Sequence, residues 1–457
     1  MKKVKRILLW ALLLWLIPTL ITALLVPAFQ KASPKLHPAP SIRGRGQEYV
    51  SVIDDNGEAL VRRLQAIEAA QKEMVLTTYY FADDESGRDI MSALQAAANR
   101  GVHVRILIDG FCNFTGKIGR SDSFQALLAS PNVEARIYNP VNLLFPFNEN
   151  YRMHDKDLMA DQLVYILGGR NTRNKSLGDY PGVPDADRDA LVYCEEQNGS
   201  ARELLSYFES VWDSGECKPI RHRRENPEAE QALRSHYVTL QKNIPEAFGP
   251  ANFKSFTVPV NSVRLLVNPV EARNKSPLLW TELLALMGEG KDIEVQTPYI
   301  ILSHRMHEQF SALTQGRKIK IITNAPESGA NPMGCAELLN RKKHLLKTGF
   351  QLCEYARDRS AHVKTVVIDD HLSIIGSFNF DMRSAYLDTE TMLLIDSPEI
   401  NAALRKTNGQ YLSCSRCSEQ GKPESLGEYF PSPRMNAVKY GLYAVLRALI
   451  VPVRHLL

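Results

Sequence analysis

The sequence predicts an α/β fold built from two related halves, because one alternation of strand-like and helix-like segments occurs twice. In each passage an apolar strand is followed by a helical stretch and then by a second apolar strand. The segments are 74–81, 91–99 and 102–108 in the first passage, and 293–300, 306–314 and 319–322 in the second. Strands that alternate with helices are typical of α/β proteins, and a repeated order indicates an internal duplication.

Length and composition agree with a folded body of two or three domains. The chain has 457 residues, of which 44% are hydrophobic and 23% are charged, as in ordinary globular proteins. These fractions argue against large-scale disorder, collagen-like repeats and a protein with many membrane spans. The 55 Lys and Arg residues nearly balance the 51 Asp and Glu residues, for a net charge of +4. Composition therefore gives no sign of an electrostatic nucleic-acid binder.

The first 29 residues (1–29) predict a single transmembrane signal anchor. Basic residues within 2–6 precede an uncharged run over 7–29, which as a helix is long enough to cross the hydrocarbon layer once. The tripeptide Val-Pro-Ala at 26–28 is a poor cleavage site, so we prefer an uncleaved anchor to a removed signal peptide. The leading basic residues favour a body outside the cytoplasm, although other basic residues follow the run. The Pro-rich segment 30–47 predicts an extended tether.

The rest of the chain divides into two halves and two less regular segments. We predict a first half over 48–216, a basic connecting segment over 217–259, a second half over 260–415 and a C-terminal tail over 416–457. The tail ends in a basic amphipathic stretch, 435–457, that contains no acidic residue. Such a helix suits the surface of an anionic membrane, and it could equally dock on its own domain.

The seven cysteines are too few for a disulfide scaffold, and their odd number leaves at least one unpaired within a monomer. Only Cys414 and Cys417 form a C-x-x-C pair. Without a second pair or suitably spaced histidines, this pair is a weak signal for zinc or redox chemistry. We predict either a local disulfide between these two residues or two free thiols.

A polar motif of the form H-x-K-x4-D-x6-G-[GS]-x-N occurs once in each half. Its members are His154, Lys156, Asp161, Gly168, Gly169 and Asn171 in the first copy, and His362, Lys364, Asp369, Gly376, Ser377 and Asn379 in the second. Histidine and lysine two positions apart on a strand point to the same face, so both can contact one ligand. The small residues allow a tight turn, and asparagine supplies amide donors. Packing alone gives no reason for these polar types to recur at the same spacing.

These residue types fit a site for a phosphodiester. Lysine and asparagine can hold the phosphate and stabilise the charge of a pentacoordinate transition state. One histidine can attack phosphorus while the other protonates the departing alkoxide and then activates the incoming alcohol or water, so we expect no metal and no other cofactor. Asp161 and Asp369 lie an odd number of positions from their histidines, so we expect them to face away and to be structural.

The paired motif is similar to the signature of the phospholipase D superfamily, over roughly 48–396. The resemblance implies two homologous phospholipase D-like halves, each a mixed β-sheet flanked by helices, that share one active site at their interface. It also implies a phosphohistidine intermediate, with His154 as the nucleophile and His362 as the general acid and base. In this family a carboxylate downstream of the asparagine orients the catalytic histidine. Glu390 matches that place in the second half and Asp187 in the first, with Asp189 as an alternative.

Within the superfamily the sequence is most similar to bacterial cardiolipin synthases. The similar segments are Arg152-Met153-His154, 168–171, 376–379, Arg383-Ser384-Ala385 and Thr389-Glu390. The resemblance implies transfer of a phosphatidyl group between phospholipid substrates, which makes cardiolipin. With the predicted anchor and its flanking charges, we expect a bacterial inner-membrane protein with its body on the periplasmic side. Phospholipase D hydrolysis to phosphatidic acid is the alternative. A nuclease is less favoured because the net charge is near zero and we expect attachment to a membrane, so we expect no nucleic-acid partner. Whether an accessory protein takes part stays open.

The loop before Asp187 is longer than its counterpart in the second half. It carries Arg173 and Lys175, which could meet an anionic head group or lie in solvent.

Overall fold

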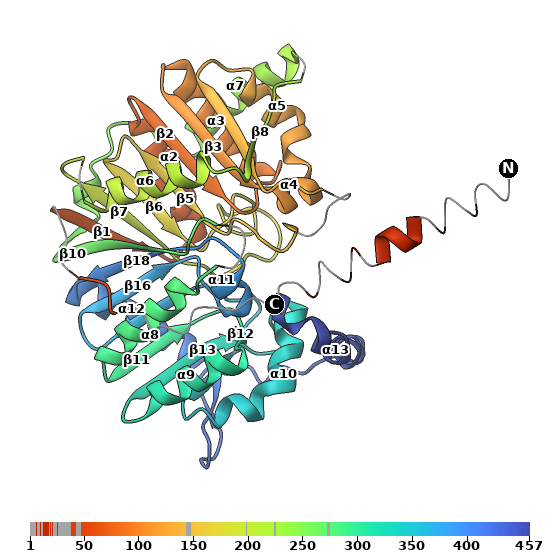
Figure 1. The fold of residues 1–457 in the computed structure, drawn as a ribbon. Helices are drawn as coiled ribbons and strands as arrows, with labels where there is room; N and C mark the ends of the chain where they lie inside the picture. The colour runs from red at the N-terminus through yellow and green to blue at the C-terminus, as the bar shows by residue number, and fades with distance from the viewer. Residues whose placement is uncertain are drawn as a thin grey trace.

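The computed structural model describes residues 38–42, 47–142, 148–197, 199–223, 225–271 and 275–457, and scattered residues between 6 and 25. It consists of two nine-stranded mixed sheets with helices on their faces, packed against each other (Figure 1). The first half runs from β1 to β9 and the second from β10 to β20. The predicted α/β fold of two halves is confirmed.

The elements of the first half are β1 (Glu48–Ile53), α2 (Asn56–Ala69), β2 (Glu73–Thr78), α3 (Glu85–Asn99), β3 (His103–Asp109), α4 (Gly110–Gly116), η2 (Ile118–Arg120), α5 (Asp122–Leu128), β4 (Val133–Tyr138), β5 (Asp157–Ala160), β6 (Val164–Gly168), β7 (Asp189–Cys194), α6 (Ser200–Trp212), β8 (Cys217–Pro219), α7 (Pro227–Asn243), η4 (Pro245–Ala247), η5 (Phe253–Ser255) and β9 (Val258–Val260).

The elements of the second half are β10 (Ser262–Val267), α8 (Leu278–Glu289), β11 (Asp292–Gln296), β12 (Ile300–Ile301), α9 (His304–Thr314), β13 (Lys318–Asn324), α10 (Pro332–Leu346), β14 (Gln351–Tyr355), β15 (Thr365–Ile368), β16 (Leu372–Gly376), β17 (Phe380–Asp381), α11 (Met382–Tyr386), β18 (Thr391–Asp396), α12 (Pro398–Ser413), β19 (Ser415–Ser418), β20 (Ser425–Leu426), α13 (Ala437–Leu449) and η6 (Val451–Leu456).

The strand order shows the duplication directly. The first sheet has the order β8-β4-β3-β2-β5-β6-β7-β1-β9, and the second has β10-β18-β16-β15-β11-β13-β14-β19-β20. Read from its other edge, the second sheet matches the first in eight strands, from β19 opposite β8 to β10 opposite β1, and β9 and β20 are edge strands without a counterpart. In both sheets a parallel pair, β2 with β3 or β11 with β13, lies beside an antiparallel neighbour, β5 or β15. The predicted passages correspond to β2-α3-β3 and β11-α9-β13. Each motif strand therefore lies near the centre of its sheet.

Three apolar clusters hold the structure together. One packs the first sheet against α2, α3 and α5, and a second packs the second sheet against α8, α9 and α10. The third joins the halves, because it combines Val192 and Leu167 of the first sheet with Val367, Ile375 and Leu393 of the second. Burial of this third cluster holds the two sheets together and fixes their relative position.

The segment 217–259, predicted as a connection, folds onto the first half instead. β8 pairs with β4, and β9 pairs with β1. Between them α7 begins at an Asn226 cap followed by Pro227, buries Leu233 and Leu240, and donates from Tyr237 Oη to Glu68 at 2.8 Å. Only two residues of α7 are buried. The segment therefore has the polar composition of a connection although it forms a surface helix. The boundary predicted at 415 also falls inside the second sheet, at the first residue of β19.

Most of the predicted anchor and most of the tether lie outside the described residues. Within the part of the chain that the structure describes, no helix is both long and apolar enough to cross a membrane. The end of the tether is docked on the body: Arg264 Nη1 donates to Ser41 O at 3.2 Å, and Ser262 Oγ donates to Ile42 O. Ile42 also packs against the apolar core of the second half.

The C-terminal helix α13 docks on the second half by one face. Tyr443 is buried and donates from Oη to Pro326 O at 3.1 Å, and Arg447 Nε donates to Asn340 Oδ1 at 2.8 Å. The chain then ends beside α11, where the main chain of Arg383 donates to Leu457 O at 3.0 Å. Of the two alternatives for this helix, docking on its own domain is therefore observed.

The predicted local disulfide is wrong. Cys417 is bonded to Cys353, and Cys414 is a buried free thiol. Cys353 on β14 and Cys417 on β19 are directly opposite each other in an antiparallel pair, which brings their side chains together on one face. Spacing along the chain cannot reveal this pairing, because it depends on β19 joining the edge of the second sheet.

We expect this disulfide to contribute to stability. Its cysteines are 64 residues apart, so reduction or the variant Cys417→Ser should lower the free energy of unfolding by about 2–4 kcal/mol through the larger entropy of the unfolded chain. Urea unfolding with and without dithiothreitol measures the change. Dithiothreitol should have no further effect on Cys417→Ser, and an unchanged urea midpoint on reduction of the parent protein would contradict the prediction.

Candidate active site

The two motif histidines lie where the halves meet. His154 precedes β5 and His362 precedes β15, so each leads into a central strand of its own sheet. Their main chains bond across the interface: His154 N donates to Thr389 O at 3.2 Å, and His362 N donates to Ala186 O at 2.6 Å. Each histidine is thus positioned by a loop of the opposite half.

The orienting carboxylates also cross between the halves. His154 Nδ1 lies 2.9 Å from Oε1 and 3.0 Å from Oε2 of Glu390. His362 Nδ1 lies 2.7 Å from Oδ2 of Asp187. An ionised carboxylate only accepts hydrogen bonds, so each Nδ1 carries a proton, and Nε2 is the ring nitrogen left for attack or proton transfer. Both carboxylates were predicted from sequence, but the crossing was not, and it leaves either half incomplete by itself.

Glu390 lies in a fully buried position among hydroxyl donors. Its carboxylate accepts from Ser384 Oγ at 2.6 Å and from Ser377 Oγ. Burial raises the pKa of Glu390 to about 7, although Lys156 and the two serines oppose the rise. The charge of Glu390 is therefore expected to change near neutral pH.

Asp187 is equally buried but more strongly held as an anion. Burial alone would raise its pKa, yet the charges of His362 and Lys364 hold the pKa of Asp187 well below its usual range. Its other oxygen, Oδ1, accepts the main-chain N–H of Arg188 at 2.9 Å. The two histidines thus have partners of different basicity.

The pKa values of the two histidines differ in the same way as those of their carboxylate partners. Burial, with added repulsion from Lys156 and Lys364, holds the pKa of His154 well below its ordinary value. Burial and Lys364 also lower the pKa of His362, but here Asp187 opposes the shift by favouring the charged form. We therefore expect His154 to rest as neutral imidazole and His362 to be the more easily protonated of the two.

The two lysines are arranged alike. Each ammonium group donates to the main-chain oxygen of the histidine in its own motif, Lys156 to His154 O and Lys364 to His362 O. Burial lowers the pKa of both, and that of Lys364 falls to about 7 with Asp187 opposing. A phosphate anion between the two lysines would favour their charged forms.

The small residues after each motif strand allow the carboxylates to approach. A Cβ on Gly169 would lie 2.1 Å from Asp187 Oδ1, so glycine is required there. At the matching position Ser377 uses its hydroxyl to hold Glu390. Cβ atoms on Gly168 and Gly376 would come equally close to the following strand.

The two motif asparagines flank the histidines and are buried. Asn171 Oδ1 accepts the main-chain N–H of Tyr80 at 3.2 Å, which leaves its Nδ2 as the donor for a ligand. Asn379 Nδ2 lies 3.2 Å from Tyr299 Oη, while its Oδ1 is buried without a partner among the described residues. Turning this amide over would let Tyr299 donate to Oδ1 and would free Nδ2 for a phosphate oxygen.

The two motif aspartates lie at the far ends of their strands. The Asp161 carboxylate accepts the N–H groups of residues 71–73 at 2.6 to 2.9 Å, and Asp369 accepts those of 291–292 at 2.9 Å. Both have positive φ, 53° and 48°, in the turn after the strand. They tie that turn to the beginning of β2 or β11.

Asp189, the alternative to Asp187, has a different environment. It lies 2.8 Å from Arg63 Nη2 and 3.2 Å from Arg170 Nη1, and it contacts neither histidine. All three side chains are buried within the first half, and Asp189 is the shared anionic partner of both arginines.

Sequence reasoning did not single out the tyrosines around the histidines. The Tyr79 ring packs edge-on against the His154 ring, with centroids 5.0 Å apart, and lies 5.3 Å from Lys156 Nζ. Tyr80 and Tyr299 hold the two asparagines at matching places. A Thr-x-Tyr sequence occurs in both halves and ends in Tyr80 and in Tyr299. Comparing the two halves would have identified these tyrosines as candidate site residues.

The arrangement can carry out two successive displacements at phosphorus. It offers two imidazoles with available Nε2 atoms, two cations and amide donors in one buried site. No group of three or more His, Cys, Asp or Glu residues placed to hold a metal ion is found in the described ranges.

Two duplicated α/β halves that each bring one H-x-K-x4-D motif to a shared site define the phospholipase D superfamily. The family model described as "Cardiolipin synthase, PLD-like domain" matches residues 64–212 and 283–410. The chain belongs to this family.

Similar proteins support this placement. Cardiolipin synthase C of Escherichia coli is 28% identical over 407 residues, which cover 79% of this chain and 84% of that protein. An uncharacterized protein of Helicobacter pylori is 26% identical over 400 residues, covering 78% of this chain and 77% of its own. In fold, the chain is similar to the crystal structure of phosphatidylserine synthase from Haemophilus influenzae, with a TM-score of 0.63 and 16% identity over 88% of this chain and 94% of that one.

Proposed function

We propose that the protein is a phosphatidyltransferase that makes cardiolipin from two phospholipid molecules through a phosphohistidine intermediate. The crossed pairing of His154 with Glu390 and of His362 with Asp187 carries the proposal, because it supplies a nucleophile and an acid–base group in one site. The similarity to cardiolipin synthase C supports the choice of phospholipids as substrates.

In the first step His154 is the nucleophile. Its imidazole is neutral, so Nε2 can form a bond to phosphorus while the bond from phosphorus to the head-group oxygen breaks. His362 gives its proton to the departing oxygen, and the ionised Asp187 stabilises the imidazolium that this role requires. Lys156 and Lys364 neutralise the phosphate oxygens as charge develops.

In the second step the roles reverse. Neutral His362 accepts the proton of the terminal hydroxyl of phosphatidylglycerol, and that oxygen attacks phosphorus while the bond to His154 Nε2 breaks. Atoms and charges then balance: one phospholipid has lost its head-group alcohol, the other has gained a phosphatidyl group, and both histidines return to their starting state. Because the intermediate can also pass to water, exclusion of water decides between transfer and hydrolysis.

Mass spectrometry of the lipid products tests the proposal. The purified full chain is incubated with phosphatidylglycerol and phosphatidylethanolamine, beside His154→Ala and His362→Ala. We expect cardiolipin with the parent protein only, and the released glycerol or ethanolamine identifies the donor. Phosphatidic acid without cardiolipin would make the protein a hydrolase, and the absence of any lipid product would direct the test to nucleic acid.

We further propose that α13 holds the body against the membrane that contains these lipids. The face opposite to its docked face carries Val438, Leu442, Val445 and Leu449 at helical spacing, with exposed fractions of 83%, 49%, 57% and 60%. The terminal stretch 435–457 has basic but no acidic residues, which suits anionic phospholipid.

The double variant Leu442→Ser/Val445→Ser should weaken binding to vesicles that contain phosphatidylglycerol. Two apolar side chains of this size each contribute on the order of 1 kcal/mol or more when buried, so we expect at least about a tenfold loss. Flotation of the chain that begins at residue 38 measures binding without the predicted anchor. Val238→Ser removes an equally exposed apolar group from α7 and should bind like the parent. Unchanged flotation of the double variant would contradict the proposal.

A further inference from the structure

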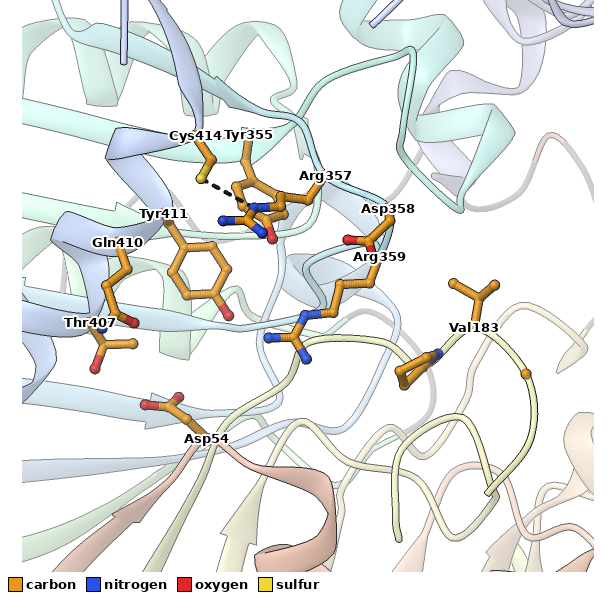
Figure 2. Close-up of a pocket in the computed structure, with 12 residues that line it drawn as sticks. Asp54, Val183, Tyr355, Arg357, Asp358, Arg359, Thr407, Gln410, Tyr411 and Cys414 are labelled. Atoms are coloured by element: carbon orange, nitrogen blue, oxygen red, sulfur yellow. Dashed lines mark hydrogen bonds between the residues drawn. The ribbon is translucent and has the colours of Figure 1, made fainter. Parts of the chain in front are cut away.

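A cavity of about 510 Å3 is lined by residues of both halves, including the segment 357–359 that comes shortly before His362 in the chain. Its lining from the first half is Asp54 and 182–184, and its lining from the second half is Tyr355, 357–359, Thr407, Gln410, Tyr411 and Cys414 (Figure 2). Arg359 is separated from His362 only by Ser360 and Ala361. Ser360 O accepts the N–H of Ala186 at 2.9 Å, so the cavity wall and the Asp187 loop are directly bonded.

Two arginines in this cavity have no carboxylate partner. Neither Arg357 nor Arg359 forms an ion pair with any described Asp or Glu; Arg357 Nε instead donates to the thiol of Cys414 at 3.3 Å, a weak acceptor. Arg359 and the hydroxyl of Tyr411 point into the same space in Figure 2. The positive charges of both arginines also oppose the rise in the pKa of Tyr355 that burial causes, so they lie close to that hydroxyl.

The acids of the lining form no ion pair with these arginines in the described structure. The Asp54 carboxylate accepts a hydrogen bond from Arg188 Nε at 2.7 Å and forms its ion pair with that buried arginine. Asp358 is exposed and forms no ion pair with either arginine in the described structure. Two guanidinium groups with hydroxyls nearby and no paired carboxylate make a site for an anion with several acceptor oxygens.

The cations that the sequence offered for a head group are occupied. Arg173 Nη2 lies 3.4 Å and Lys175 Nζ lies 3.1 Å from the carboxylate of Asp185. They line a separate cavity on the other side of the loop 182–184. Of the two groups of basic residues that flank this loop, the pair on the second half is the one with free charge.

We propose that this cavity binds the phosphodiester of the acceptor, an anionic glycerophospholipid, while the phosphatidyl group is bonded to His154. The inference rests on the proposed transfer reaction. The attacking hydroxyl of such an acceptor is only a glycerol unit away from its own phosphate, and that phosphate would repel the one held by Lys156 and Lys364 unless separate cations bind it. Water brings no second phosphate, so the cavity favours the lipid acceptor over hydrolysis.

The partition of the intermediate tests this inference. With phosphatidylglycerol as the only lipid, the full-length variant Arg357→Gln/Arg359→Gln should release glycerol within about twofold of the parent rate. Its ratio of cardiolipin to phosphatidic acid should fall about tenfold or more, because only the second step uses the cavity. Arg173→Gln is the matched control and should keep the parent ratio. An unchanged ratio in the double variant, or an equal fall in the control, would overturn the inference.

A binding measurement separates this inference from the proposed function. Short-chain phosphatidylglycerol is titrated by calorimetry into His154→Ala, with and without the two arginine substitutions, so that no turnover is needed. A loss of at least about tenfold in affinity, with phosphatidylcholine affected less than twofold, supports the cavity even if the parent protein only hydrolyses lipid. Equal affinities overturn it. Free glycerol phosphate should bind far more weakly than the lipid, and equally tight binding would overturn the assignment to a lipid head group.

Discussion

Replacing His154 with alanine is expected to lower kcat at least about 1000-fold, and replacing His362 is expected to do the same. The first change removes the atom that bonds to phosphorus, and the second removes the group that protonates the leaving oxygen. The losses should be far from additive in the double variant, because the two residues serve one reaction. Near-normal turnover of either single variant would refute a site shared between the halves.

The two variants should differ in what they accumulate. His362→Ala keeps the nucleophile but lacks the base that activates the acceptor, so a phosphatidyl group should remain on His154. Mass spectrometry of the intact protein after incubation with short-chain phosphatidylglycerol, followed by peptide mapping, locates this group. His154→Ala should show no adduct. An adduct on His362 in that variant would reverse the two assigned roles.

The duplication explains why the sequence could predict so much of the fold. One polar motif occurs twice, each time after a comparable β-α-β passage. The sequence therefore predicts that His154 and His362 occupy equivalent positions in the two halves. Equivalent positions imply equivalent strands, and β5 and β15 do occupy corresponding places in their sheets. Local periodicity and internal comparison were sufficient, because both depend on residues close together in sequence.

Features that depend on contacts between distant segments were not predictable in this way. The crossing of Glu390 to His154 requires β18 of one half to meet β5 of the other, and no local pattern encodes that meeting. The Cys353–Cys417 disulfide similarly depends on β19 joining the sheet edge. In α7 the buried residues are Leu233 and Leu240, too few for a clear helical pattern of apolar residues.

Each carboxylate bonds the histidine of the opposite half, and the two carboxylates differ in charge state although the two halves have the same fold. Gly169 admits the short Asp187 side chain against a histidine and a lysine, and these cations keep it ionised. Ser377 replaces that glycine in the second half, and Glu390 there is surrounded by hydroxyls that hold it without ionising it fully. In the proposed mechanism these differences suit His362 to the role of acid and His154 to that of nucleophile.

Asp187→Asn should test this asymmetry with a large effect, a fall in kcat of about 100- to 10,000-fold. Asparagine fits the same space, but it removes the charge that favours imidazolium on His362 and can also stabilise the wrong tautomer. Since Asp187 raises the pKa of His362, its loss lowers that pKa further, and the protonated fraction at a given pH falls. The alkaline limb of the kcat profile should therefore move to lower pH, which steady-state kinetics over pH 5 to about 9 can measure.

Two neighbouring variants make the Asp187→Asn result specific. Glu390→Gln resembles the protonated form of Glu390, whose pKa is about 7, so its rate should approach that of the parent below pH 7 and fall behind as the pH rises past that value. Asp189→Asn leaves Arg63 and Arg170 buried with less negative charge and should mainly lower the melting temperature. Measuring kcat together with thermal unfolding separates the cases, because Asp187→Asn should lose activity even well below its melting temperature, whereas Asp189→Asn should keep most of its kcat there. If Asp187→Asn retained its kcat and its pH profile, the ionised partner of His362 would have no part in proton transfer, and the assignment of His362 as the acid would fail.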